Sequence, residues 1–314
     1  MSAVRYYRYD DAGAPSIAGK VGSLTNLLRK CLVGTGGTAY DSKPSAGWTE
    51  AYTGTNIAVF RNSVADGGSG CYVRVNDNAP AGGGGAREAT INVYGNMTGI
   101  NTGTSPLKTV YARKSATADA VARKWLIVAD ARTAWLYIWE TGDGSYAGTA
   151  YDVSFNGFGD FASIHTTTAR YFNMGRIDAN NSFGGQLSAV ISRNFSGPTG
   201  LSAMPLTGTG PAVDLVIDAP GLAGGCIGGY YWPSRAHSVT AKTYFMRNPN
   251  IFAIASSELH GSLRGLALPY QNLQSSPRAA GFEGEASLIL CHVAADGASS
   301  DFASLLLDAV GPWS

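Results

Sequence analysis

Apolar residues recur at helical spacing in one early segment, residues 23–33. The spacing is i, i+3, i+4, i+7 and i+8, which lines one face of an α-helix. The residues are Leu24, Leu27, Leu28, Cys31 and Leu32. Ser23 stands before them as a suitable N-cap, and Gly34 follows them as a helix terminator. The pattern predicts a short amphipathic helix over 23–33.

Most of the remaining chain consists of short β-type segments separated by glycine, asparagine and serine. Residues 125–130 and 134–139 are apolar runs three residues apart, which predicts a tight hairpin. Residues 71–77 and 89–94 flank a glycine-rich loop and predict a hairpin with a long connection. Further strands are predicted at 151–155, 187–192, 213–217, 243–247, 251–255 and 287–293.

A second, weaker helical pattern lies near the C-terminus, at residues 301–310. Its apolar residues are Phe302, Leu305, Leu306 and Ala309. Helices do not alternate with the predicted strands, which disfavours a parallel α/β sheet. The predicted fold class is therefore mainly β, with β-sandwich or barrel-like lobes, one N-terminal helix and a C-terminal helix.

The chain length of 314 residues allows two domains or one large β domain. We predict an N-terminal β-rich domain at 1–140 and a C-terminal β-rich domain at 141–314. The glycine-dense stretch 141–149 would separate them, and the alternative is an ordinary loop within a single domain. No repeat of fixed period is visible, which weighs against a propeller or a solenoid.

The charge balance excludes several classes of partner. Lys and Arg number 23 against 22 Asp and Glu, which gives a formal net charge of +1. Such a chain has no broad field to attract nucleic acid or an anionic membrane. The first residues lack the apolar core of a signal peptide, and no apolar run is long enough to span a bilayer. We expect a protein without membrane insertion that is made in a cytoplasm. Charged residues make up only 14% of the chain, which favours a protein whose surface is largely covered by neighbours in an assembly.

Signatures of catalysis and metal binding are missing or incomplete. The segment 67–71 fails the nucleophile-elbow pattern at its last position, and the glycine-flanked segment 13–20 is one residue too long for a phosphate loop. The cysteines and histidines are scattered, and Asp160 is as well explained by a turn as by a glycosidase pair. We therefore expect no catalytic, cofactor-binding or metal-binding residues and no enzymatic activity. The scattered residues are Cys31, Cys71, Cys226, Cys291, His165, His237, His260 and His292.

Three aromatic residues share one face of the predicted strand 134–139. Trp135, Tyr137 and Trp139 alternate with Leu136 and Ile138. If the aliphatic face is the core, the aromatic face is a platform for a subunit interface or for stacking on a glycan. The alternative is burial of both faces, with the aromatic one between two β layers.

The opening run Arg5, Tyr6, Tyr7, Arg8 and Tyr9 is too polar for a central strand. It is either an arm that reaches onto a neighbouring subunit or an edge strand of its own sheet. The sequence does not favour one over the other.

Several segments in the first 140 residues, taken in order, carry a resemblance that composition does not. They are GSLTNLL (22–28), KPSAGWT (43–49), YTGTNIAVF (52–60), GCYVRVND (70–77), AREA (86–89), YGNMTGINTGT (94–104), KSATAD (114–119) and WLIVAD (125–130). This ordered series resembles a family of virion structural proteins of tailed bacteriophages. The likeness fades beyond residues 159–161.

The resemblance implies a non-enzymatic component of a phage particle that is assembled in the host cytoplasm. We expect it in the tail or baseplate region, in multiple copies that contact each other and other virion proteins, as a ring or trimer. One alternative is a capsid decoration protein. Another is a tail module for host attachment that binds a host surface glycan. The family supplies no catalytic residues.

Overall fold

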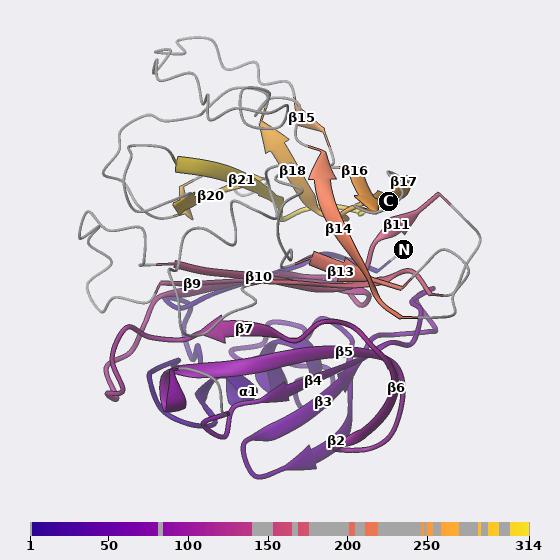
Figure 1. Cartoon of the computed structure of the whole chain (residues 1–314). Coiled ribbons are helices and arrows are strands. Elements are labelled where there is room, and N and C mark those ends of the chain that lie inside the picture. The colour runs from indigo at the N-terminus through magenta and orange to yellow at the C-terminus, as the bar shows by residue number, and fades with distance from the viewer. Residues whose placement is uncertain are drawn as a thin grey trace, which may run out of the picture.

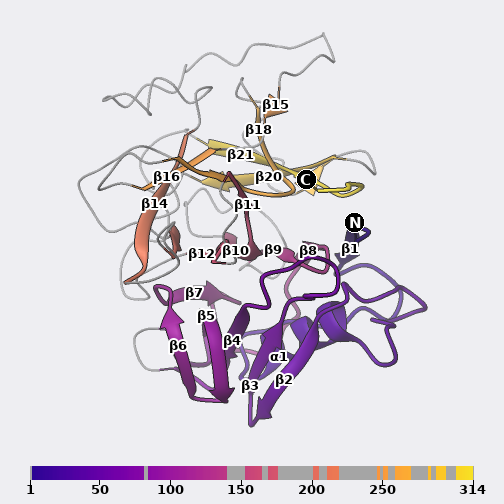
Figure 2. The same cartoon turned by 90° about the vertical axis from the view of Figure 1, so that its right-hand side faces the viewer.

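The structure is a computed structural model of the whole chain. It describes residues 2–80, 84–139, 153–164, 169–175, 201–204, 211–218, 246–247, 250–253, 259–269, 282–283, 288–294 and 302–313. Within these residues the fold is mainly β, as the sequence predicted, and the strands form three antiparallel sheets. Figures 1 and 2 show the sheets as layers, with the N-terminal sheet below and a C-terminal sheet above a central one.

The lower sheet is built from the first half of the chain. Its order is β2 (Thr49–Gly54), β3 (Ile57–Arg61), β4 (Tyr72–Asn76), β5 (Glu88–Gly99) and β6 (Thr102–Pro106), with β7 (Val110–Arg113) also paired to β5. A short 3-10 helix, η2 (Gly85–Arg87), precedes β5. The pairing of β4 with β5 confirms the predicted long-looped hairpin.

The central sheet draws strands from both halves of the chain. Its order is β1 (Arg5–Arg8), β8 (Trp125–Ala129), β9 (Thr133–Trp139), β10 (Val153–Asp160), β12 (Tyr171–Met174), β13 (Leu201–Ala203), β14 (Val213–Asp218), β16 (Asn250–Ala253), β17 (Leu259–Ser262) and β11 (Ala162–Ser163). The pairing of β8 with β9 confirms the predicted tight hairpin.

The division predicted at residue 140 falls between two paired strands. β9 and β10 run side by side from Thr133 opposite Gly159 to Trp139 opposite Val153. One sheet therefore continues across the division, which favours the single-domain alternative. The stretch 141–149 and the strand predicted at 187–192 lie outside the described residues.

The upper sheet contains the C-terminal strands. Its order is β15 (Met246–Arg247), β18 (Leu266–Pro269), β21 (Phe302–Asp308), β20 (Leu288–Ala294) and β19 (Phe282–Glu283). The helix predicted at 301–310 is wrong, because residues 302–308 form β21 between β18 and β20. A short apolar run fits either a helix or a buried strand, and pairing on both sides decides for the strand.

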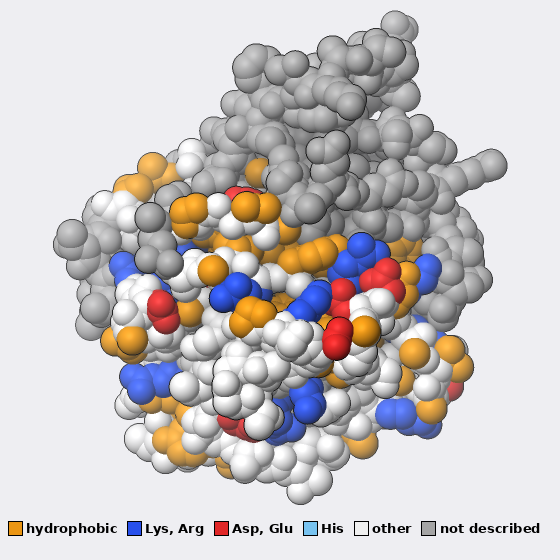
Figure 3. Space-filling view, turned by 180° about the vertical axis from the view of Figure 1, so that it is seen from behind, with side chains coloured by type: hydrophobic (Ala, Val, Ile, Leu, Met, Phe, Trp, Pro, Cys, Tyr) orange, Lys and Arg blue, Asp and Glu red, His pale blue; other side chains and the backbone are white. Residues whose placement is uncertain are grey.

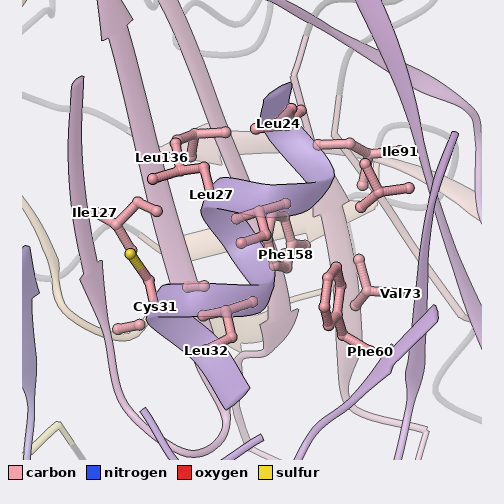
Figure 4. Packing of buried hydrophobic residues seen from close by; sticks show 14 of the residues in the cluster. Leu24, Leu27, Cys31, Leu32, Phe60, Val73, Ile91, Ile127, Leu136 and Phe158 are labelled. Atoms are coloured by element: carbon pink, nitrogen blue, oxygen red, sulfur yellow. The ribbon is translucent and has the colours of Figure 1, made fainter. Parts of the chain in front are cut away.

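The helix predicted at 23–33 is present and lies between the lower and central sheets. It begins as α1 (Ser23–Leu28), continues as a π-helical turn, η1 (Arg29–Val33), and ends at Gly34, whose φ is 68°. The apolar face is completely buried. Figure 4 shows the helix between Ile127 and Leu136 of the central sheet and Phe60, Val73 and Ile91 of the lower sheet.

The α1 N-terminus is capped from a distant strand end rather than by Ser23. The Ser23 hydroxyl donates to the backbone carbonyls of Ala18 and Lys20. Asp77, just after β4, accepts the Leu24 N–H at 2.7 Å on Oδ2. A carboxylate at this position satisfies an unpaired backbone donor and faces the positive end of the helix dipole.

Asp77 is also the partner of a buried lysine. Lys114 Nζ donates to Asp77 Oδ1 and to the Lys20 carbonyl oxygen at 2.6 Å, and both charged side chains are fully buried. Burial raises the pKa of Asp77 to about 6, although Lys114 opposes the shift. Burial lowers the pKa of Lys114. The pair fixes the end of β4 and the segment after β7 to the start of α1.

Polar side chains of the central sheet take the place of a neighbouring strand for β7 and the segment before it. The Arg113 N–H donates to Ser154 Oγ at 3.1 Å, and Asn156 Nδ2 donates to the Tyr111 carbonyl at 3.2 Å. The backbone of Lys108 is bound in the same way. Its N–H donates to Ser202 Oγ, and its carbonyl accepts a hydrogen bond from Asn173 Nδ2. Backbone groups that would be costly to bury unpaired are thereby satisfied.

The substitution Lys114→Met tests the buried pair. It leaves the Asp77 charge without its counterion, and we expect a loss of about 3–5 kcal/mol in the free energy of unfolding near pH 8. A carboxyl whose folded-state pKa lies above its unfolded value of 3.8 lowers stability as the pH rises through that interval. Without the ammonium the folded-state pKa rises further, so the loss should be smaller near pH 5, where Asp77 takes up a proton.

Urea unfolding at both pH values measures this difference. Lys20→Met is the matched control, because the Lys20 ammonium is exposed and donates only to the Ala118 carbonyl in the described residues. A loss for Lys114→Met that is equal at the two pH values, or no larger than that of the control, would contradict the assignment.

Candidate functional site: the arginine–aspartate cluster

The three aromatic residues singled out from the sequence are interior residues. Trp135, Tyr137 and Trp139 on β9 have exposed fractions of 0%, 0% and 2%. Trp135 stacks on Phe155 at a ring separation of 5.5 Å and an interplanar angle of 11°, and its Nε1 donates to the Arg264 carbonyl at 2.8 Å. The rings therefore lie between two β layers, which was the alternative to a surface platform. They offer no face for a glycan in this fold, because all three side chains are buried.

The opening run is an edge strand rather than an extended arm. Arg5, Tyr6, Tyr7 and Arg8 form β1, which pairs with β8, and the Tyr9 N–H continues the ladder to the Trp125 carbonyl at 3.1 Å. The Tyr7 ring is buried, and its hydroxyl donates to the Pro44 carbonyl at 2.9 Å. The run therefore forms one edge strand of the chain's own central sheet.

A group of five charged side chains lies at the end of the central sheet, where the β8–β9 turn meets the end of β10. We call it the arginine–aspartate cluster, and it consists of Asp130, Arg132, Asp160, Arg170 and Arg264. Asp130 and Arg132 belong to the turn, and Asp160 ends β10. Arg170 precedes β12, and Arg264 lies between β17 and β18. Residues far apart in sequence are brought together here.

The tight turn between β8 and β9 is shaped by the Asp130 side chain. Its Oδ1 accepts the N–H groups of Arg132 at 2.9 Å and Thr133 at 2.8 Å, which is an Asx-type turn. The Arg132 carbonyl in turn accepts the Asp160 N–H at 3.0 Å. Gly159 beside it has a φ of 113°, and a Cβ there would lie 2.3 Å from that carbonyl, so only glycine fits.

Asp130 forms a buried ion pair with Arg264. Nη2 of Arg264 lies 2.8 Å from Oδ2 and Nη1 lies 3.3 Å from Oδ1, and the two side chains are 1% and 2% exposed. Arg264 also donates to Thr133 Oγ1 and to the Trp313 carbonyl, each at 2.9 Å. This bidentate geometry fixes the β17–β18 turn and the C-terminal segment to the β8–β9 turn.

Asp160 is buried and holds the β3–β4 connection against the central sheet. Its Oδ1 accepts Asn62 Nδ2 at 2.8 Å and the Ser69 hydroxyl at 2.5 Å, while Oδ2 accepts the Ser69 N–H at 2.8 Å. Arg132 Nε and Arg170 Nε lie 3.7 and 3.6 Å from Oδ2, which is ion-pair range without a hydrogen bond. Burial raises the pKa of Asp160, and the hydrogen bonds from Ser69 and Asn62 oppose that shift.

The chemistry open to the cluster is ion pairing and hydrogen bonding. Both carboxylates are occupied by backbone and side-chain donors, so neither is poised as a general base. Among the described residues, no group of three or more His, Cys, Asp or Glu side chains is placed to hold a metal ion. Cys31 and Cys71 are free and buried, and burial raises the pKa of both thiols, which disfavours a nucleophilic thiolate.

Sequence reasoning missed most of the cluster. Asp160 was considered only as a loop carboxylate, and the others were not singled out. One signal was present at Arg264, a single charge within the otherwise apolar run 263–268. A lone arginine in such a run predicts a buried ion pair, but the sequence gives no means of choosing Asp130 as its partner.

No protein-family model matches the sequence, and no curated protein matches it. Within the described residues, none of the helices has the length and apolar character needed to cross a membrane.

Replacing Arg264 tests whether the cluster joins the layers. Arg264→Met keeps the length of the side chain but leaves the Asp130 charge buried and unpaired, so we expect a loss of about 3–5 kcal/mol in the free energy of unfolding. In the double variant Asp130→Asn, Arg264→Met the unpaired charge is absent, and part of the loss should be recovered. Chemical denaturation of the wild type, both single variants and the double variant gives the coupling energy. Additive losses would show that the two residues do not depend on each other.

Proposed function

We propose that the chain is a non-enzymatic structural component of a tailed-bacteriophage virion. We place it in the tail or baseplate region, where multiple copies contact each other and other virion proteins. Assembly takes place in the host cytoplasm, and the assembled protein belongs to the particle. Its role is architectural: it supplies a rigid β-rich subunit for packing against neighbours.

The observation that carries the proposal is the ordered series of segments between residues 22 and 130. In the fold these segments are adjacent parts of one packed unit, because α1, β3, β4, β5 and β8 all line the same core. The aspartates that end two of the segments, Asp77 and Asp130, are occupied in capping α1 and pairing with Arg264. The series therefore specifies a scaffold, which is what the resemblance implies.

The charge distribution supports an architectural role over binding to nucleic acid. The chain carries a formal net charge of +1. Figure 3 shows one face of the molecule, on which Lys and Arg side chains lie among Asp and Glu side chains in the described part. On this face, interspersed charges of both signs leave no extended positive surface for a phosphate backbone in the described part.

Two alternatives also place the chain in the phage particle but give it a different role there. A capsid decoration protein would have the same scaffold at a different location. A receptor-binding tail module would need a glycan site other than Trp135, Tyr137 and Trp139, because those rings are buried. The location on the particle separates the first alternative from the proposal.

Immunogold labelling of purified particles tests the proposal. We expect gold at the tail or baseplate, because the proposed subunit is an integral part of that structure. Antibodies should be raised against exposed segments, such as the β2–β3 hairpin around residues 53–56. Gold over the head would favour the decoration protein. An absence of gold on the particles, with an antibody shown to bind the purified folded protein, would contradict a virion role.

A further inference from the structure

One part of the arginine–aspartate cluster carries more positive charge than the fold neutralises. Asp130 is matched by Arg264 in a close bidentate pair. Asp160, by contrast, is the shared ion-pair partner of both Arg132 and Arg170. Among the described residues, these two guanidiniums therefore share one carboxylate within ion-pair distance.

The Asp160 carboxylate is also occupied by other donors. Three hydrogen bonds, from Asn62 and from the amide and hydroxyl of Ser69, take three of the about four acceptor positions on its two oxygens. Among the buried polar atoms of the described residues, Nε of Arg132 and Nε of Arg170 have no hydrogen-bond partner. A buried guanidinium N–H without an acceptor is costly, so Asp160 leaves part of the hydrogen-bonding capacity of both side chains unmet.

The two arginines remain within reach of solvent. Their side chains are 19% and 31% exposed, although their Nε atoms are buried. Arg170 Nη2 is held by the Gly67 carbonyl, which fixes the direction of that side chain. Burial and the neighbouring Arg264 and Arg170 charges lower the pKa of Arg132, as expected where cations are crowded.

We propose that Arg132 and Arg170 form a binding site for an oxyanion. Two partly exposed guanidiniums that share one buried carboxylate present planar, charge-assisted donors, the kind of group that recognises carboxylate, sulfate or phosphate oxygens. The oxyanion comes either from solution or from an acidic side chain of a neighbouring copy, and only the second source rests on the proposed function. The bound anion would neutralise the second guanidinium through the exposed part of the two side chains, since their Nε atoms are buried.

Sulfate is the probe for the site. Thermal unfolding of the full chain is followed against sulfate concentration, with sodium chloride at equal ionic strength as the reference for screening. We expect a saturable rise in the melting temperature with sulfate beyond the chloride effect, because a ligand that binds only the folded state stabilises it. Arg132→Gln and Arg170→Gln should each weaken the apparent affinity roughly ten- to a hundredfold, the range for a lost charge-assisted hydrogen bond.

Arg74→Gln is the matched control. Arg74 is a half-buried arginine on the lower sheet that donates to the Ile100 carbonyl and to Asn101, away from the cluster. Its sulfate response should equal that of the wild type. Arg170→Lys retains the charge and most of the packing, so this variant should fold. It should bind sulfate more weakly than wild type if the planar guanidinium is the donor. A wild-type response no larger than that to chloride would overturn the proposal, as would wild-type affinity in both glutamine variants.

Sedimentation velocity distinguishes the two sources of the oxyanion. If an acidic side chain of a neighbouring copy occupies the site, sulfate and Arg170→Gln should both shift oligomers toward smaller species. If the anion comes from solution, the size distribution should stay the same while sulfate still binds. Both results support the site, and neither depends on where the protein lies on a particle, so the proposal can fail independently of the virion role.

Discussion

The pairing of β9 with β10 determines where the other layers of this protein lie. It joins strands on either side of residue 140 into one sheet, so the N-terminal and C-terminal parts of the chain share a backbone hydrogen-bond network. Side chains alternate across a strand, and here both faces are apolar. Leu136 and Ile138 face the core around α1, whereas Trp135 packs on Phe155 and Phe172 on the opposite face. A sheet with two apolar faces has to be covered on both sides.

Covering a sheet on both faces also buries polar groups, and several of these in the described residues have defined partners. Ser154 and Asn156, on the lower face of β10, bond to the backbone of β7, so that strand needs no second neighbour. At the end of the same sheet, Asp130 and Asp160 hold the upper and lower layers through Arg264 and Ser69. Such contacts stabilise because the alternative is an unpaired buried polar group, which costs far more than the bond itself gains. Alignment of the layers is thus fixed by a few directional contacts within a larger apolar core.

Local features of the fold could be predicted from the sequence, and long-range ones could not. The helix over 23–33 was predictable because its spacing is local, and so was the hairpin of β8 and β9. The cap of α1 was not, since Asp77 lies 53 positions from Leu24. Residues 302–308 have helical spacing, and the sequence does not show that β18 and β20 pair with this segment on either side. In the candidate site, Arg264 stands out in its apolar run, but its partner is 134 positions away.

An architectural role fits a molecule in which carboxylates, thiols and aromatic rings are used for packing, capping and ion pairing. This architecture requires the two parts of the chain to form one unit around the central sheet. Scanning calorimetry of the full chain tests this most directly. A shared sheet predicts one transition whose calorimetric enthalpy equals its van't Hoff enthalpy. Two separate transitions, or a calorimetric enthalpy well above the van't Hoff value, would show that the parts unfold independently and would contradict the account.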